Sequence, residues 1–288
     1  MKTHTFKCWA LLVNFGSESS FIEFSKDIRI RKLTFSEKQT LKDRLSKWSN
    51  IKYDEFAIEC LLHKEVSKSV PNTFLKDGRK EIEKCLTTLR LFKESILGYN
   101  LIVQSKGTNS HINAAITLKH YELYLGPGTE YSQKKYEIAA NEEMNLISLF
   151  SKFKTNAFKQ LELPIHYFNK SYIEPYTPRD SLVDLIISLE SLFLKDESQE
   201  LGYKLRIRMA ILLAECIEKR EDVVQNMKKA YNLRGQIVHG EKNPVIDYDF
   251  LFKIREYTRK SLIIFLKNPE LRNQLDKIVL NGKTPLNE

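Results

Sequence analysis

The sequence predicts two domains of different fold class, a mixed α+β domain over residues 1–160 and an all-α helical bundle over residues 161–288. Three observations lead to this prediction. The chain has 288 residues, more than one domain usually holds, and its apolar content of 42% is that of a folded protein. Strand and helix patterns alternate in the first part. From Glu142 onward nearly every segment has the 3.6-residue periodicity of an α-helix.

The strand signals are confined to the first domain. Short apolar runs and period-two alternation, bounded by polar or glycine-containing turns, predict strands at 9–15, 21–24, 28–33, 56–62, 101–104 and 114–125. The last of these runs ends at Gly126-Pro-Gly128, a turn signal that lacks the Gly-Lys-Ser/Thr ending of a phosphate-binding loop.

Two helices are predicted between these strands. Thr34-Phe-Ser-Glu37 is a capping box, because the Thr34 hydroxyl can accept from the third helical amide while Glu37 reaches back to the Thr34 amide. A helix should therefore run from here to about Trp48. Apolar residues recur at helical spacing from Ile82 to Phe92, which predicts the second helix.

The second domain should be a bundle of antiparallel helices joined by short polar connections. The helices are predicted at 142–160, 165–174, 179–195, 200–218, 221–239, 248–267 and 269–279. The helix at 142–160 fits either domain, so the boundary near residue 160 depends on it.

The net charge of +9 is concentrated in the first domain. Residues 1–160 hold 26 basic and 18 acidic side chains, an excess of +8, whereas residues 161–288 hold 20 and 19, an excess of +1. Such an excess is typical either of a surface that binds polyanions, RNA or DNA, or of an ordinary solvated surface. Both interpretations stay open for the first domain.

Composition argues against secretion, membrane insertion and metal binding. The longest apolar runs, 9–13 and 262–266, are far shorter than the roughly 18 residues of a membrane span, and the N-terminal run lacks a leader's cleavage site. No Cys-x-x-Cys or zinc-like His spacing is present. We expect a cytoplasmic protein without metal or cofactor, with reduced cysteines in its core at Cys8, Cys60, Cys85 and Cys216.

An arginine lies among apolar residues on the predicted helix 221–239. On a helical wheel, Arg234 falls in the middle of the face formed by Val223, Met227, Ala230, Tyr231, Ile237 and Val238. A buried guanidinium needs a partner, and Glu190, at the edge of the apolar face of the helix 179–195, is the candidate. The two residues form either a structural ion pair or part of a cleft.

A histidine follows five residues later, at the end of the same helix. His239 immediately precedes Gly240, a residue type that ends helices, and it lies about 140° around the helix from Arg234. The two side chains converge either if the final turn unwinds or if two copies of the helix pack antiparallel. In the second case a homodimer builds the site.

These residues carry a resemblance to a known family. Arg234 and His239, with four residues between them, are similar to the R-x(4–6)-H signature of HEPN ribonucleases, and Tyr231-Asn-Leu-Arg-Gly-Gln-Ile-Val-His-Gly240 resembles the ApeA-like HEPN group. Leu189-Glu-Ser-Leu-Phe193 and Tyr203-Lys-Leu-Arg-Ile-Arg-Met-Ala210 resemble the two preceding helices of that group. The similarity covers about 165–267. The sequence departs from the family at Gly235, where a polar residue is frequent.

The resemblance implies a metal-independent endoribonuclease that leaves 2′,3′-cyclic phosphate and 5′-hydroxyl ends. Arg234 would bind the phosphate and His239 would move the proton. Support for the active site would come from Glu190, Tyr231 and Gln236.

Arg208 lies at the margin of the apolar face of its own helix. It is either a second ligand for the RNA phosphate or a structural arginine.

Other functions stay open at this point. The main alternative is a catalytically inactive HEPN module that binds RNA or nucleotide, or that only dimerises. A toxin silenced by tyrosine modification would need R-x4-H-x-Tyr, and the corresponding position is Glu241. The resemblance implies phage defence or toxin-like stress response, with RNA as substrate. The first domain would sense an unidentified trigger or position the RNA.

Overall fold

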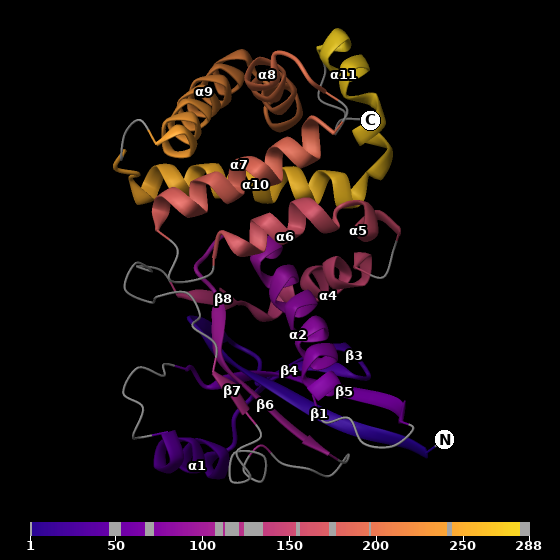
Figure 1. The fold of residues 1–288 in the computed structure, drawn as a ribbon. Helices are drawn as coiled ribbons and strands as arrows, with labels where there is room; N and C mark the ends of the chain where they lie inside the picture. Colours follow the sequence, from indigo (N-terminus) through magenta and orange to yellow (C-terminus); the bar gives the residue numbers. More distant parts are fainter. Residues whose placement is uncertain are drawn as a thin grey trace. The chain divides into compact units, whose positions relative to one another are not determined.

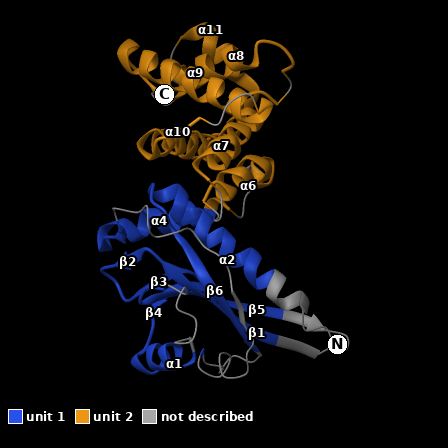
Figure 2. Cartoon of the chain, turned by 60° about the vertical axis from the view of Figure 1, so that its left-hand side comes forward, with its two compact units in different colours: residues 1–151 blue, residues 152–288 orange. Residues whose placement is uncertain are grey.

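The computed structural model describes residues 2–45, 53–66, 72–106, 112, 121–123, 135–153, 156–172, 177–195, 197–240 and 244–282 (Figure 1). Contacts divide the chain into two compact units, residues 1–151 and 152–288 (Figure 2). The first unit is mixed α+β, and the described elements of the second are all helical, as predicted. The segment 142–160 forms two helices, α4 (Glu143–Lys152) and α5 (Asn156–Gln160), and the units divide at the end of α4.

The first unit is built on a six-stranded sheet with the order β3-β4-β5-β1-β6-β7, in which all neighbours are antiparallel. Every strand overlaps a predicted one. Most of the predicted strand 114–125, and the turn at 126–128, lie outside the described residues. The strands are β1 (Lys2–Val13), β3 (Phe21–Ser25), β4 (Ile28–Lys32), β5 (Phe56–Val66), β6 (Gly98–Lys106) and β7 (Tyr121–Leu123).

The chain bends sharply where a single strand was predicted at 9–15. Asn14 has a left-handed backbone with φ of 63°, a conformation that asparagine tolerates better than most residues. Its side-chain amide donates to the Ile96 carbonyl at 2.7 Å and fixes the bend. The following β2 (Phe15–Ser17) leaves the main sheet and pairs in parallel with β8 (Tyr136–Ile138), a strand the sequence analysis did not predict.

Helices lie on both faces of the sheet (Figure 1). On one face, α2 (Asn72–Phe92) and α4 bury apolar side chains against the strands, with Ile82, Leu86, Leu146 and Phe150 among them. On the other face, α1 (Phe35–Leu45) contributes Leu41 to a second, smaller core. The strands are therefore buried on both sides over much of their length.

The predicted capping box begins α1. The amide of Glu37 donates to the Thr34 hydroxyl at 3.3 Å, and the amide of Thr34 donates to the Glu37 carboxylate at 2.9 Å. Both of these N-terminal amides are satisfied, which is what a capping box requires. The described part of α1 ends at Leu45, and the expected end near Trp48 lies outside the described residues.

Three cysteines lie in the larger core of the first unit, as expected. Cys8, Cys60 and Cys85 are buried, and burial raises the pKa of each thiol, that of Cys8 to about 12. Neutral thiols of this kind pack like small apolar side chains. The expectation was wrong for Cys216, which is exposed just before α9.

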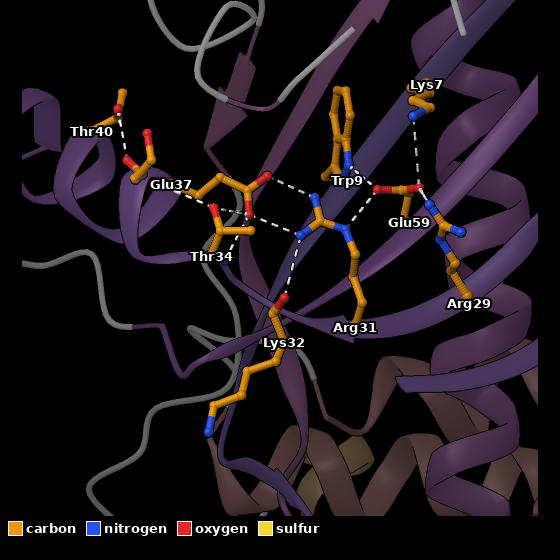
Figure 3. Close-up of polar contacts among 10 residues, drawn as sticks. Lys7, Trp9, Arg29, Arg31, Lys32, Thr34, Glu37, Thr40 and Glu59 are labelled. Atoms are coloured by element: carbon orange, nitrogen blue, oxygen red, sulfur yellow. Dashed lines mark hydrogen bonds and ion pairs between the residues drawn. The ribbon is translucent and has the colours of Figure 1, made fainter. Parts of the chain in front are cut away.

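A buried network of charges joins β1, β4, β5 and α1 (Figure 3). The Glu59 carboxylate accepts from the Trp9 indole at 2.7 Å and from Arg31 Nε at 2.7 Å, and it also pairs with Arg29. Arg31 then reaches Glu37 with both terminal nitrogens, at 2.8 and 2.7 Å. Arg31 thus links two carboxylates that come from different elements.

Both carboxylates of this network are ionised at neutral pH. Burial alone would raise the pKa of Glu59, but hydrogen bonds from Arg31 and Trp9 outweigh it and hold the pKa below 4.5. For Glu37, hydrogen bonds from Arg31 and Thr34 do the same. A network that satisfies its charges in this way ties the sheet to α1.

The second unit is a helical bundle in which α7 packs against α6, α9 and α10, and α8 packs against α9. A capping box of Thr177 and Asp180, with Pro178 in the first turn, begins α7. The helices are α6 (Glu162–Lys170), α7 (Pro178–Phe193), α8 (Leu201–Leu213), α9 (Ile217–His239), α10 (Tyr248–Lys267) and α11 (Leu275–Asn281).

The observed helix ends differ from the predicted ones at the α8–α9 junction. The helix predicted at 200–218 ends at Leu213, because Ala214 is extended, and α9 begins at Ile217 rather than at 221. The Ala214 carbonyl accepts from Arg220 at 2.9 Å, which holds the corner. At the C-terminus, the predicted helix 269–279 is a 3-10 turn (Pro269–Gln274) followed by α11. A search of the described helices finds none with the length and apolar character of a membrane span.

Candidate active site in the helical unit

Arg234 lies in the last two turns of α9, beyond the buried residues of that helix. Of the apolar face predicted for this helix, Val223, Met227 and Ala230 are buried, but every residue from Tyr231 to His239 is half-buried or exposed. The buried part of this face therefore ends at Ala230. The Arg234 side chain is 28% exposed, so it lies at the edge of the core and not inside it.

Glu190 of α7 pairs with Arg234. The distance from Arg234 Nη2 to Glu190 Oε2 is 3.7 Å, longer than the roughly 2.7–2.9 Å of a charge-assisted hydrogen bond. Arg234 Nε is buried and has no hydrogen-bond partner among the residues that the structure describes. The carboxylate thus neutralises the guanidinium without using all its donors.

Tyr231 completes a cluster with these two residues. Burial raises the pKa of Tyr231, and the negative charge of the nearby Glu190 carboxylate raises it further. The Arg234 guanidinium carbon lies 6.0 Å from the centre of the Tyr231 ring. Glu190 is therefore shared between a phenol and a guanidinium, both of α9.

Gly202, in the first turn of α8, leaves the space that the Tyr231 ring occupies. A Cβ atom at Gly202 would lie 2.9 Å from Cδ1 and 3.0 Å from Cε1 of that ring, closer than side chains approach one another. The sequence analysis did not single out this glycine. The sequence contains one hint of this role: glycine lowers helix stability, so a glycine early in a helix indicates a close contact at that position.

Replacement of Gly202 by alanine should destabilise the helical unit by about 1–3 kcal/mol, the usual cost of overpacking, less about 0.5–1 kcal/mol for the gain in helix propensity. Gly235→Ala is the matched control, because nothing lies within 4 Å of a Cβ atom at that helical position. It should be neutral or stabilising. Urea unfolding followed by circular dichroism measures both, and equal stabilisation by the two substitutions would show that the Tyr231 ring is not held as described.

His239 is the last residue of α9 and is exposed. The helix remains continuous up to it, and Gly240 ends the helix in the left-handed conformation with φ of 67°, as its residue type predicted. The final turn does not unwind. Arg234 and His239 are therefore about 140° apart around the helix and about 7.5 Å apart along its axis.

Gln236 lies between them and is half-buried. Its side chain makes no hydrogen bond to any residue in the part of the chain that the structure describes. Gly235, where a polar residue was expected from the resemblance, leaves open space on its side of the helix. Neither residue joins the cluster of Glu190, Tyr231 and Arg234.

Arg208 has the contacts of a structural arginine, the second of the two alternatives. Its side chain is 6% exposed, and it donates to the Phe193 carbonyl at 2.6 Å, to Glu197 at 2.6 Å and to Asp276 at 2.5 Å. These bonds link the end of α7, the start of the next connection and α11. Burial alone would lower the pKa of Arg208, but the two carboxylates outweigh it and raise the pKa.

No three His, Cys, Asp or Glu side chains among the described residues gather closely enough to hold a metal ion. Comparison of the chain with family models, with curated proteins and with solved structures found no match.

Proposed function

We propose that this chain is a HEPN-type endoribonuclease that cuts RNA through Arg234 and His239, without a metal ion. The observation that carries the proposal is the state of Arg234. It is partly exposed, loosely paired with Glu190 at 3.7 Å, and has a buried Nε without a partner in the described residues. The terminal nitrogens of this guanidinium make no hydrogen bond within the described residues, and they are the donors that could bind a phosphate as a fork.

The chemistry requires one base, one acid and stabilisation of the phosphorane. In this proposal the 2′-hydroxyl oxygen forms a bond to the adjacent phosphorus while the bond from phosphorus to the 5′-oxygen breaks. A His239 imidazole takes the proton from the 2′-hydroxyl or gives one to the leaving 5′-oxygen. Arg234 stabilises the charge that develops on the phosphate oxygens. DNA, which lacks the 2′-hydroxyl, is not a substrate.

A homodimer through α9 would bring the two groups together. One continuous helix directs Arg234 and His239 to different sides, whereas two antiparallel copies about a two-fold axis would place the arginine of one near the histidine of the other. This end of the helix has apolar surface for such a contact, because Ile237 is half-buried and Val238 is 53% exposed. Light scattering should show a dimer at assay concentrations. An active monomer would remove the composite site.

The second candidate is a catalytically inactive module that binds RNA or nucleotide, or only dimerises. The separation of Arg234 and His239 on one helix, together with the ion pair that occupies Arg234, favours it. Binding of RNA without cleavage, unchanged by substitution of His239, would identify this function.

Incubation of the purified protein with total RNA, followed by analysis of the new ends, tests the proposal. We expect 2′,3′-cyclic phosphate and 5′-hydroxyl ends. Ends with 5′-phosphate would contradict the proposed chemistry, since they arise when water attacks the phosphorus. The biological role we propose is phage defence or a toxin-like response, in which the first unit senses a trigger or positions the RNA.

Cleavage should persist at the full rate in excess EDTA. The reason is that Arg234 supplies the positive charge that a metal ion gives in other nucleases. Rates measured with EDTA, and then with added magnesium or manganese, check this. A loss that either metal restores would assign the protein to a different class of nuclease.

A further inference from the structure

The first two turns of α8 carry an exposed aromatic ring, Tyr203, and a half-buried cation, Arg206. Tyr203 is 53% exposed, and the Arg206 guanidinium carbon lies 5.0 Å from the centre of its ring. Residues three apart on a helix are neighbours, so the pair is built into the helix itself. It forms one surface with an aromatic face and a positive charge.

Arg206 keeps its charge unneutralised in the described part of the chain. Two other arginines of the helical unit do pair with carboxylates, Arg208 with Glu197 and Asp276, and Arg259 with Glu256. No carboxylate among the described residues lies within ion-pair distance of Arg206. An exposed ring beside a free cation is the arrangement with which proteins stack nucleic-acid bases and attract the backbone.

The position of this pair connects it to the candidate site. Tyr203 directly follows Gly202, whose backbone contacts the Tyr231 ring, and Arg206 lies one helical turn beyond Gly202 on the same stripe. The same Tyr231 ring lies 6.0 Å from the Arg234 guanidinium carbon. The turn of α8 that carries Tyr203 therefore packs beside the turn of α9 that carries the proposed phosphate ligand.

We propose that Tyr203 and Arg206 form a stacking platform for an unpaired RNA base next to the phosphate held by Arg234. This inference rests on the proposed function, which it extends from the reacting phosphate to a neighbouring base. The platform selects single-stranded RNA, because a base within a duplex has no free face for the tyrosine ring. It confers little sequence preference, since every base has an aromatic face.

A second tyrosine–cation pair in the same unit gives a matched control. On α6, Tyr167 and Lys170 have the same spacing, with Nζ 5.5 Å from the ring centre. Lys170, however, donates to the buried Asp184 at 3.0 Å, and Tyr167 is half-buried. This pair is neutralised and partly covered, so its loss should leave binding of RNA unchanged.

The test measures fluorescence anisotropy of the full chain with two probes. One is a short single-stranded 2′-O-methyl oligoadenylate, which has no free 2′-hydroxyl and is not cut. The other is an abasic oligomer with the same number of phosphates. Tyr203→Leu should weaken binding of the oligoadenylate by about 5- to 100-fold, the range for loss of one stacked base, and leave binding of the abasic oligomer unchanged. Tyr203→Phe keeps the ring and should bind as the wild type does. Arg206→Ala should weaken both, and Tyr167→Leu neither.

Other results would overturn the platform, the ribonuclease proposal or both. Equal binding of the oligoadenylate by Tyr203→Leu and the wild type overturns the platform, as does an equal loss with both probes. Failure of the wild type to bind either probe overturns it together with the choice of RNA as ligand. If binding depends on Tyr203 but total RNA is not cut, the platform stands and the ribonuclease proposal fails. If RNA is cut in an Arg234-dependent way without dependence on Tyr203, the platform alone fails.

Discussion

Arg234→Ala should lower the rate of RNA cleavage by at least about 10²-fold, the usual loss when one donor to a charged transition state is removed. His239→Ala should lower it by about 10²- to 10⁴-fold, because proton transfer loses its acid or base. Initial rates on total RNA measure both. Two control variants come from the same unit: Arg259→Ala removes an arginine that pairs with Glu256, and His166→Ala removes another exposed histidine. Both controls should cleave normally.

A mixture of the two inactive variants distinguishes a shared site from a site within one chain. Hybrid dimers of Arg234→Ala and His239→Ala contain one composite site in which both the arginine and the histidine are intact. The mixture should therefore recover part of the wild-type rate. No recovery, in a mixture shown to exchange subunits, would place both groups within one chain. Wild-type rates in the double variant would show that the reaction occurs elsewhere.

Glu59→Gln should destabilise the first unit by about 3 kcal/mol, the lower end of the range for breaking a buried ion pair. The substitution removes the charge that holds Arg31 and the partly exposed Arg29, while its size is unchanged. The chain's two tryptophans, Trp9 and Trp48, both lie within residues 1–151, so their fluorescence during urea unfolding reports on this unit.

Glu55→Gln is the matched control for this measurement, because Glu55 also pairs with two cations, Lys32 and Lys38, but on the surface. It should leave the unfolding midpoint unchanged. An equal shift from the two substitutions would mean that burial adds nothing to the Glu59 network.

The same network makes the first unit sensitive to acid. Since the folded pKa of Glu59 and of Glu37 lies below 4.5, the unfolded chain takes up protons first as the pH falls. Their contribution to stability is therefore complete above about pH 4.5 and decreases below it. Glu59→Gln should lose less stability than the wild type over this lower range.

Local signals in the sequence predicted much of the fold, because they act within a few residues. Thr34 and Glu37 form their capping box, and Gly240 ends α9. The unpredicted features depend on distant contacts. The short strand β8 exists because β2, more than a hundred residues earlier, pairs with it. The break after Leu213 carries no glycine or proline, and an arginine from the next helix stabilises it.

In the candidate site, too, local patterns were predictable from the sequence and distant contacts were not. Periodicity placed Arg234 within one apolar face and Glu190 at the edge of another, and the two side chains do pair. Periodicity also placed Arg208 at the margin of an apolar face, but it could not reveal Asp276, 68 residues away, as its partner. The role of Gly202 was equally hidden, because it depends on the position of one ring from another helix.

Amide hydrogen exchange should be slower in the first half of α9 than in its last two turns. Its first half is anchored by buried Val223 and Met227 and by Asp222, which accepts from the Tyr257 hydroxyl at 2.9 Å, whereas its last two turns contain no buried residue. Local opening is easiest where few contacts must break, so protection should fall along the helix toward His239. In a protein assembled as proposed, contact between two copies would cover this end of the helix and raise the protection of its amides. Protein concentration would then set both the protection of these amides and the fraction of molecules able to react.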